Sequence, residues 1–161
     1  MTDAPPGAAT VSRTPPPLAL VIFGASGDLT ARKILPALAE LANRGRLNER
    51  FCVIGVARTE WTDEEFRDVA RKADPTGATR WAELVKCFRY VTGEYATSAT
   101  FDRLKEVLAE ADKERGTSGN RVYYLATVPA VFAEVAEALA KEGCNQPAEG
   151  GDFVRLVVEK P

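Results

Sequence analysis

The sequence predicts an α/β fold, doubly wound, with a mainly parallel sheet and helices on both faces. Short apolar runs alternate with longer segments of helical period, which is typical of βα units. The runs contain few polar residues, as in strands covered by helices on both sides. With 161 residues, 45% of them apolar, the chain fits one globular domain.

The first predicted strand spans Leu18 to Phe23, and a glycine-containing turn connects it to a helix from about Leu29 to Arg46. The helix is indicated by apolar residues at offsets of three and four, which are Ile34, Leu35, Leu38 and Leu41. Gly45 fits the C-terminal stop of this helix.

The second predicted strand, Phe51 to Ala57, precedes a helix that begins with a capping box formed by Thr62 and Glu65. We expect that helix to end near Ala73, because a proline follows at position 75. A shorter helix, about residues 77–86, leads into the third strand, Phe88 to Thr92.

The second half of the chain repeats the alternation. A long amphipathic helix is marked by the apolar residues Phe101, Leu104, Val107, Leu108 and Ala111. A loop at 116–120, a strand from Val122 to Ala126, a helix behind Pro129 and a last strand from Phe153 to Val158 follow. The classic strand order 3-2-1-4-5-6 predicts one further strand, so we expect an unpaired edge that favours aggregation.

Composition narrows the function classes. The net charge of −2 and the absence of a basic patch argue against a nucleic-acid partner. No apolar run approaches the roughly 20 residues that cross a bilayer, and no signal peptide is visible, so we expect a cytoplasmic protein without a membrane partner. The scattered cysteines Cys52, Cys87 and Cys144 argue against a disulfide framework and against a metal site. Residues 1–17, rich in proline, are expected to form a disordered tail before the domain at 18–161.

The turn after the first strand is the strongest candidate site. It reads Gly24-Ala25-Ser26-Gly27-Asp28-Leu29-Thr30 and lies between a buried strand and a helix. Gly24 permits a tight turn, Gly27 permits close approach of a pyrophosphate, and the N–H groups opening the helix supply donors. Ser26 can add a hydroxyl donor. The alternative is an ordinary strand-to-helix turn in which Asp28 only caps the helix.

Arg58 and Thr59 follow the second strand, where an NAD-selective Rossmann-like domain usually presents an acid to the ribose. A guanidinium pairs with the 2′-phosphate of NADP, which a carboxylate would repel, so the sequence favours NADP as the cofactor. The alternative is that Arg58 is a plain surface charge. Lys33, one turn into the first helix, and Lys160, after the last strand, are candidates for binding an anionic cofactor or substrate. For Lys33 a solvated helix position is the alternative.

Four blocks carry a resemblance to a known family. Residues 24–36, 55–58, 90–93 and 158–161 resemble the glucose-6-phosphate dehydrogenase family in order and spacing. The resemblance implies oxidation of glucose 6-phosphate to 6-phosphogluconolactone with NADP, at the entry of the pentose phosphate pathway. It places the cofactor on residues 24–30, the 2′-phosphate at Arg58, and both cofactor and sugar phosphate near Lys160. It also implies a cis peptide bond at Pro161.

The chain departs from the family pattern in several places. Thr30 stands where alanine is usual, Phe132 where tyrosine is frequent, and Thr127-Val128-Pro129 where two adjacent prolines are expected. The chain contains no histidine, so the resemblance places the catalytic base, like the substrate and assembly domain, beyond residue 161. We therefore expect no turnover by the chain alone, and a homo-oligomer only for a full-length enzyme. The alternatives are a free-standing NADP-binding regulatory or sensor module and another Rossmann oxidoreductase, for which a Tyr-x-x-x-Lys pair is missing after the fourth strand.

Overall fold

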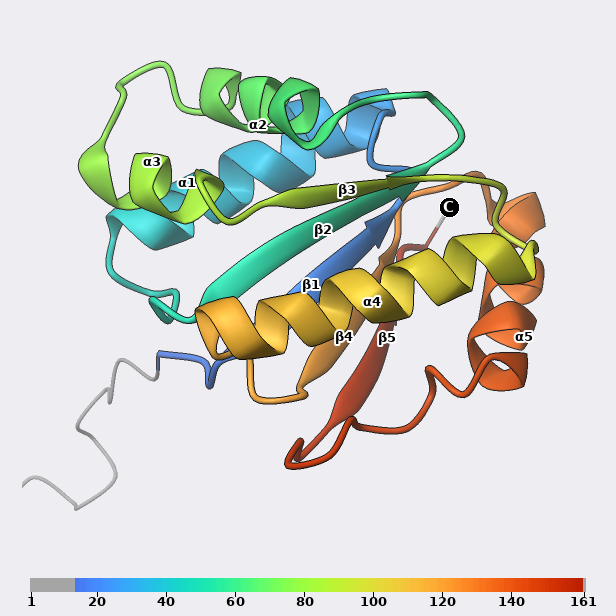
Figure 1. Ribbon diagram of the computed structural model, residues 1–161. Helices are drawn as coiled ribbons and strands as arrows, with labels where there is room; N and C mark the ends of the chain where they lie inside the picture. The colour runs from blue at the N-terminus through green and yellow to red at the C-terminus, as the bar shows by residue number, and fades with distance from the viewer. Residues whose placement is uncertain (1–13, 161) are drawn as a thin grey trace, which may run out of the picture.

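The computed structural model describes residues 14–160. Its five strands form one parallel sheet in the order β3-β2-β1-β4-β5 (Figure 1). They are β1 (Leu18–Phe23), β2 (Phe51–Ala57), β3 (Arg89–Thr92), β4 (Arg121–Leu125) and β5 (Val154–Val158). This is the doubly wound α/β order that the sequence predicts. The proline-rich tail expected over residues 1–17 lies, as far as residue 13, outside the described residues.

Helices cover the two faces of the sheet in separate layers (Figure 1). One layer contains α1 (Leu35–Asn43), α2 (Asp63–Lys72) and α3 (Thr79–Val85), and the other contains α4 (Ser98–Arg115) and α5 (Phe132–Lys141). Two single-turn elements complete the set, the π-helix η1 (Thr30–Ile34) and the 3₁₀-helix η2 (Pro129–Val131). None of the helices in residues 14–160 is long and apolar enough to cross a membrane.

The central strand β1 supplies both hydrophobic cores, because successive side chains of a strand point to opposite faces. Leu18, Leu20 and Ile22 lie in the core under α1, α2 and α3. Phe23 lies in the core under α4 and α5, where its ring is 6.1 Å from the ring of Phe101. The apolar residues predicted to line the long helix, Phe101, Leu104, Val107, Leu108 and Ala111, are all buried there.

The first helix differs from its prediction. It begins with the π-helical turn η1, and after that turn its buried face consists of Leu35, Ala39 and Ala42. Leu41, predicted to be in the apolar stripe, is 39% exposed. A π-helical turn holds more residues per turn than an α-helix, so it rotates the following residues away from the face that an α-helical period predicts.

Other predictions are confirmed with small shifts at the ends of elements. The Thr62 hydroxyl accepts the Glu65 N–H at 3.1 Å, and the Glu65 carboxylate accepts the Thr62 N–H at 2.7 Å, which completes the capping box. Gly45 has the left-handed φ of +71° expected after a helix C-terminus. The fourth strand begins one residue earlier than predicted, at Arg121, which pairs with Val154 of β5.

Candidate functional site

The turn after β1 is fixed by contacts with two neighbouring strands. Gly24 has a left-handed φ of +89°, and its N–H donates to the Val56 carbonyl at the end of β2 at 2.8 Å. A Cβ on Gly24 would lie 2.7 Å from the Ala126 carbonyl oxygen, which follows β4. Only glycine fits this position, because both the backbone conformation and the contact with Ala126 exclude a side chain.

Thr30 closes the same turn from the helix side. Its side chain is fully buried, and its hydroxyl donates to the Gly24 carbonyl at 3.1 Å. Its position in η1 turns the hydroxyl inward, toward the strand end. The departure from alanine at this position therefore adds a hydrogen bond within the turn and leaves the outer surface of the turn unchanged.

The donors available to an anion come from the start of the helix. The N–H groups of Gly24 and Ala25 donate to the Val56 carbonyl, and the N–H of Gly27 donates to the Gly24 carbonyl at 3.0 Å. The first N–H groups of a helix have no acceptor inside it. The helical segment begins at Asp28, and no side chain caps η1 among the described residues. Among the described residues no hydrogen bond of the Asp28 carboxylate to the helix start is found, and Asp28 itself is exposed. The first N–H groups of this helix are therefore candidates for binding an anion.

Space for a ligand exists at the second glycine. Gly27 is exposed, and a Cβ there would contact only the Gly24 carbonyl, at 3.3 Å. Ala25, by contrast, is 1% exposed and packs inward against Gly55 of β2. Among the predicted site residues, Ala25 therefore positions the turn from beneath, and Gly27 forms the accessible side.

The loop that follows β2 is tied to this turn. The Ser26 and Thr59 hydroxyl oxygens are 2.9 Å apart, so residues 33 positions apart in the sequence share a hydrogen bond. The Tyr90 hydroxyl of β3 donates to the Thr59 carbonyl at 2.7 Å, and burial raises the pKa of Tyr90 to about 12. Arg58, next to Thr59, is exposed and forms no ion pair with any residue in 14–160. Its guanidinium is thus available to a ligand.

Two tyrosines of this region were missed by sequence reasoning. Besides Tyr90, the ring of Tyr95 is 9% exposed and meets the ring of Phe23 edge-on at 6.1 Å. Burial raises the pKa of Tyr95, against the opposing effects of the Arg58 charge and a hydrogen bond with the Gly24 backbone. Tyr90 lies within the block of residues 90–93 that resembles the family, and Tyr95 follows it shortly. An aromatic residue near a strand end does not by itself predict a role in a binding site.

The lysine candidates are more dispersed. Lys33 is exposed on η1, and Lys160 is exposed directly after β5. β4 lies between β5 and β1 in the sheet, and among the described residues no ion pair involves Lys160. The residue before Lys160 is held by β4, because the Tyr124 hydroxyl donates to the Glu159 carboxylate. Pro161, with its expected cis peptide bond, lies outside the described residues.

Comparisons with known proteins agree on one family. The family model "Glucose-6-phosphate dehydrogenase, NAD binding domain" matches residues 21–161. A glucose-6-phosphate 1-dehydrogenase 2 of Mycobacterium bovis is 40% identical over 151 residues, covering 90% of this chain and 29% of that protein. The glucose-6-phosphate 1-dehydrogenase of Chlamydia pneumoniae is 39% identical over 158 residues, covering 92% and 31%.

The fold comparison points the same way. A solved structure described as glucose-6-phosphate dehydrogenase in complex with its substrate glucose-6-phosphate superimposes with a TM-score of 0.77 at 32% identity. The match covers 91% of this chain and 31% of that one. The chain therefore spans about 30% of the length of the relatives it matches.

Proposed function

The chain belongs to the glucose-6-phosphate dehydrogenase family, and from that premise we propose that it is the NADP-binding part of an enzyme that oxidises glucose 6-phosphate. The product of that reaction is 6-phosphogluconolactone, formed at the entry of the pentose phosphate pathway. The observation that carries the proposal is the hydrogen bond between Ser26 and Thr59, which joins a phosphate-binding turn to a loop with a free guanidinium.

The residues of the site fit the cofactor. The helix start at Asp28 offers unpaired N–H donors and a positive dipole end to the pyrophosphate, and Gly27 leaves room for it. Arg58 is available for a bidentate pair with the 2′-phosphate, which NAD lacks, and Thr59 adds a hydroxyl. When bound, NADP supplies the acceptor for the hydride that leaves the sugar carbon.

The remaining groups of the reaction are divided between this chain and the rest of such an enzyme. We assign to Lys160 a contact with both the cofactor and the sugar phosphate, because the chain after β5 lies at the same edge of the sheet as the turn. The sequence contains no histidine, so a histidine base must come from outside residues 1–161. We therefore propose that this chain binds NADP but does not turn over substrate. We propose a cytoplasmic, homo-oligomeric enzyme only for a longer protein that contains this chain.

Titration of the chain with NADP and with NAD tests the assignment of Arg58. We expect Arg58→Ala to weaken NADP binding by about tenfold to a hundredfold, because hydrogen bonds to charged groups contribute about 1.5–3 kcal/mol. NAD binding should change by less than about threefold. The matched control is Arg103→Ala, which removes an exposed arginine on α4. Equal losses of affinity for NADP and NAD would contradict the assignment of the 2′-phosphate to Arg58.

The assignment of turnover has a separate test. The chain mixed with NADP and glucose 6-phosphate should produce no NADPH above a control without protein, measured by absorbance of the reduced nicotinamide. Sustained NADPH formation would show that the chain holds its own base, and the division of the reaction proposed above would be wrong.

A further inference from the structure

A pair of thiols lies at the end of the sheet opposite the candidate cofactor site. Cys52 is in β2 and Cys87 is in the turn between α3 and β3, and the parallel register that pairs Ile54 with Arg89 brings them level. The Cys52 thiol donates to the Cys87 carbonyl at 3.0 Å. The Cys87 thiol donates to the Leu84 carbonyl at 3.0 Å and to the Phe51 carbonyl, next to Cys52, at 3.4 Å. Two cysteines 35 positions apart in the chain are thus in direct contact across neighbouring strands.

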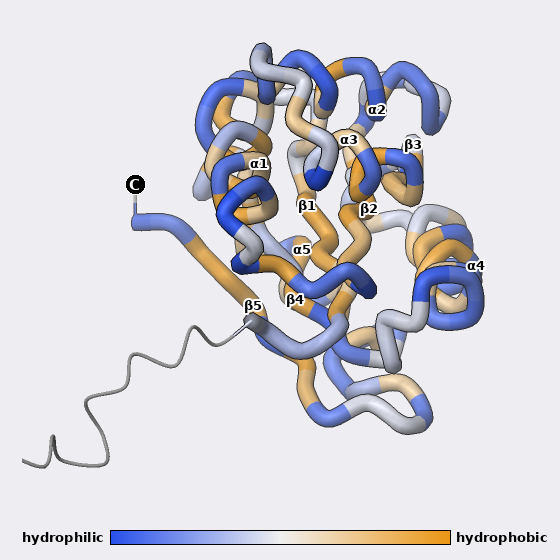
Figure 2. Tube along the Cα trace, turned by 90° about the vertical axis from the view of Figure 1, so that its left-hand side faces the viewer, coloured by the Kyte–Doolittle hydropathy of each residue, from blue (hydrophilic) through white to orange (hydrophobic). Residues whose placement is uncertain are grey.

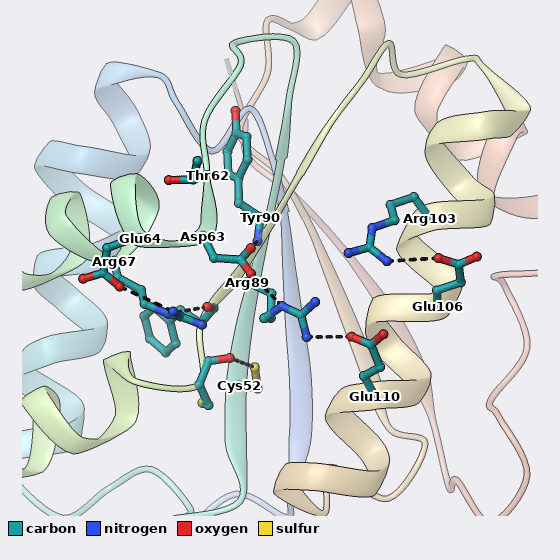
Figure 3. A network of polar contacts seen from close by, with 12 residues as sticks. Cys52, Thr62, Asp63, Glu64, Arg67, Arg89, Tyr90, Arg103, Glu106 and Glu110 are labelled. Carbon is teal, nitrogen blue, oxygen red and sulfur yellow. Dashed lines mark hydrogen bonds and ion pairs between the residues drawn. The ribbon is translucent and has the colours of Figure 1, made fainter.

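A pocket of about 410 Å³ opens beside this pair. Both cysteines line it, with the cationic side chains of Arg67, Lys86, Arg89 and Arg115 and the acids Asp63 and Glu114. Figure 3 shows Cys52, Arg67 and Arg89 around this part of the β3 edge. The Nε atom of Arg115 is buried and has no hydrogen-bond partner within residues 14–160. A small solute in this pocket is next to both cysteines. More of the side chains that surround it are positively charged than negatively charged.

The two sulfurs are not equivalent. The neighbouring Cys52 side chain lowers the pKa of the Cys87 thiol, against the effect of burial, and the charges of Arg115 and Arg67 lower it further. The Cys87 side chain and burial raise the pKa of Cys52 well above its ordinary value. The thiolate is the reactive form of cysteine, so Cys87 is the nucleophile of the pair and Cys52 the partner.

From this geometry we propose that Cys52 and Cys87 form an oxidation site at which hydrogen peroxide generates an intrachain disulfide. The Cys87 thiolate attacks one peroxide oxygen, so that an S–O bond forms, the O–O bond breaks, and hydroxide leaves and is protonated to water. The Cys52 sulfur then attacks the Cys87 sulfenic acid, so that an S–S bond forms and a second water leaves. Two thiols are oxidised by two electrons, and one peroxide is reduced to two waters.

The third cysteine supplies an internal control. Cys144 is 5% exposed and lies next to Tyr123, and burial raises the pKa of its thiol. It belongs to the core under α4 and α5 and does not line the pocket. A general sensitivity of thiols to peroxide would modify Cys144 as well, whereas the proposed site predicts selective reaction at Cys52 and Cys87.

The test is peroxide treatment of the chain followed by alkylation and peptide mass spectrometry. The wild type should lose two hydrogens in a linked peptide pair containing Cys52 and Cys87, and dithiothreitol should reverse the loss. Cys52→Ser should accumulate a sulfenic acid at Cys87 that dimedone traps, whereas Cys87→Ser should leave Cys52 reduced. Cys144→Ser should behave as the wild type. The proposal is overturned if peroxide oxidises Cys144 first, if the disulfides join different chains, or if Cys87 reacts no faster than free glutathione.

Two further measurements keep the result interpretable. Circular dichroism of each variant establishes that it is folded, and the comparison of rates is restricted to folded variants. NADP affinity should stay within about twofold after disulfide formation, because the pair lies ~20 Å along β2 from Arg58. Loss of NADP binding by the reduced wild type would contradict the proposed function alone, whereas failure of the disulfide to form would contradict this inference alone.

Discussion

The two edges of the sheet are built differently. At the β3 edge, Asp63 of α2 accepts the outward N–H of Tyr90 at 2.8 Å, and Arg67 donates to the outward carbonyl of Phe88 at 2.9 Å (Figure 3). At the β5 edge, no such caps are present among the described residues. Instead Leu156, Val157 and Val158 are 45%, 37% and 48% exposed, and Figure 2 shows this strand as an apolar segment at the margin of the molecule.

The difference shows how one sheet can end in two ways. Unpaired strand edges attract other strands, and proteins protect them with charged side chains or with covering segments. The β3 edge is protected by charges that also satisfy its backbone groups. The β5 edge has apolar side chains and free backbone groups, which is the composition of a strand that another segment covers. The exposed edge expected from the strand count is therefore located at β5.

The largest expected effect comes from removing Arg89, which binds the capping residue Asp63 at the β3 edge. Arg89 binds Asp63 at 2.9 Å and Glu110 at 2.7 Å and so connects α2 with α4 across the edge. Its side chain is 19% exposed, so water replaces these bonds only in part. We expect Arg89→Ala to lower the free energy of unfolding by about 2 kcal/mol, measured by urea denaturation.

The control for this prediction is Arg103→Ala, which breaks an exposed pair with Glu106. We expect a loss of at most about 0.5 kcal/mol for that variant. Similar losses for the two arginines would mean that the ion pairs of Arg89 stabilise the β3 edge no more than an exposed ion pair does.

The next effect concerns self-association through β5. The wild type should associate in a concentration-dependent way, and Val157→Lys should weaken association at least about tenfold, since a charge on an edge strand opposes strand pairing. Sedimentation velocity measures both. The matched control is Leu41→Lys, because Leu41 is exposed to a similar extent, 39%, on α1. A wild type that stays monomeric, or equal effects of the two lysine substitutions on association, would show that the chain does not self-associate through the β5 edge.

The smallest effect is a pH dependence at the amino end of β4, the strand that carries β5. Burial would raise the pKa of Asp112, but hydrogen bonds from Arg121, Thr117 and the Gly119 N–H outweigh it and lower this pKa. A carboxyl whose pKa is lower in the folded state stabilises the fold above its unfolded pKa, and this stabilisation is lost as pH falls through the folded value.

The corresponding comparison is between the wild type and Asp112→Asn. At neutral pH we expect the variant to be less stable by about 1 kcal/mol, because it loses the charged partner of Arg121. The difference should shrink below about pH 4, where the unfolded carboxyl is protonated and the folded one follows. Urea denaturation at both pH values measures it. A stability difference that does not change with pH would show that the charge of Asp112 does not contribute to the stability of the fold.

The strands with uninterrupted apolar runs were predictable from the sequence. β1 and β2 have the predicted bounds, because each is buried on both faces and carries its pattern in six or seven consecutive residues. The glycine turn was also predictable, since its position between a strand and a helix limits what it can be. The π-helical turn η1 was not predictable, because no local sequence pattern marks the extra residue that a π-helical turn contains.

The supporting contacts of the site depend on the register of the sheet. Pairing of Gly55 with Tyr90 brings the Tyr90 hydroxyl to Thr59, and a sequence does not display that register. The same holds for Tyr95, whose ring position follows from packing against Phe23. The residues that we assign to the cofactor thus had sequence signals, whereas the residues that hold them in place required the fold.

The hydrogen bond between Ser26 and Thr59 also has a kinetic meaning. The two segments that we assign to the pyrophosphate and to the ribose are already linked without any ligand, so little chain entropy remains to be lost when the dinucleotide arrives. Preorganisation of this kind removes the need for a slow rearrangement after encounter. We therefore expect capture of the dinucleotide in a single step, with differences in affinity appearing mainly in the dissociation rate.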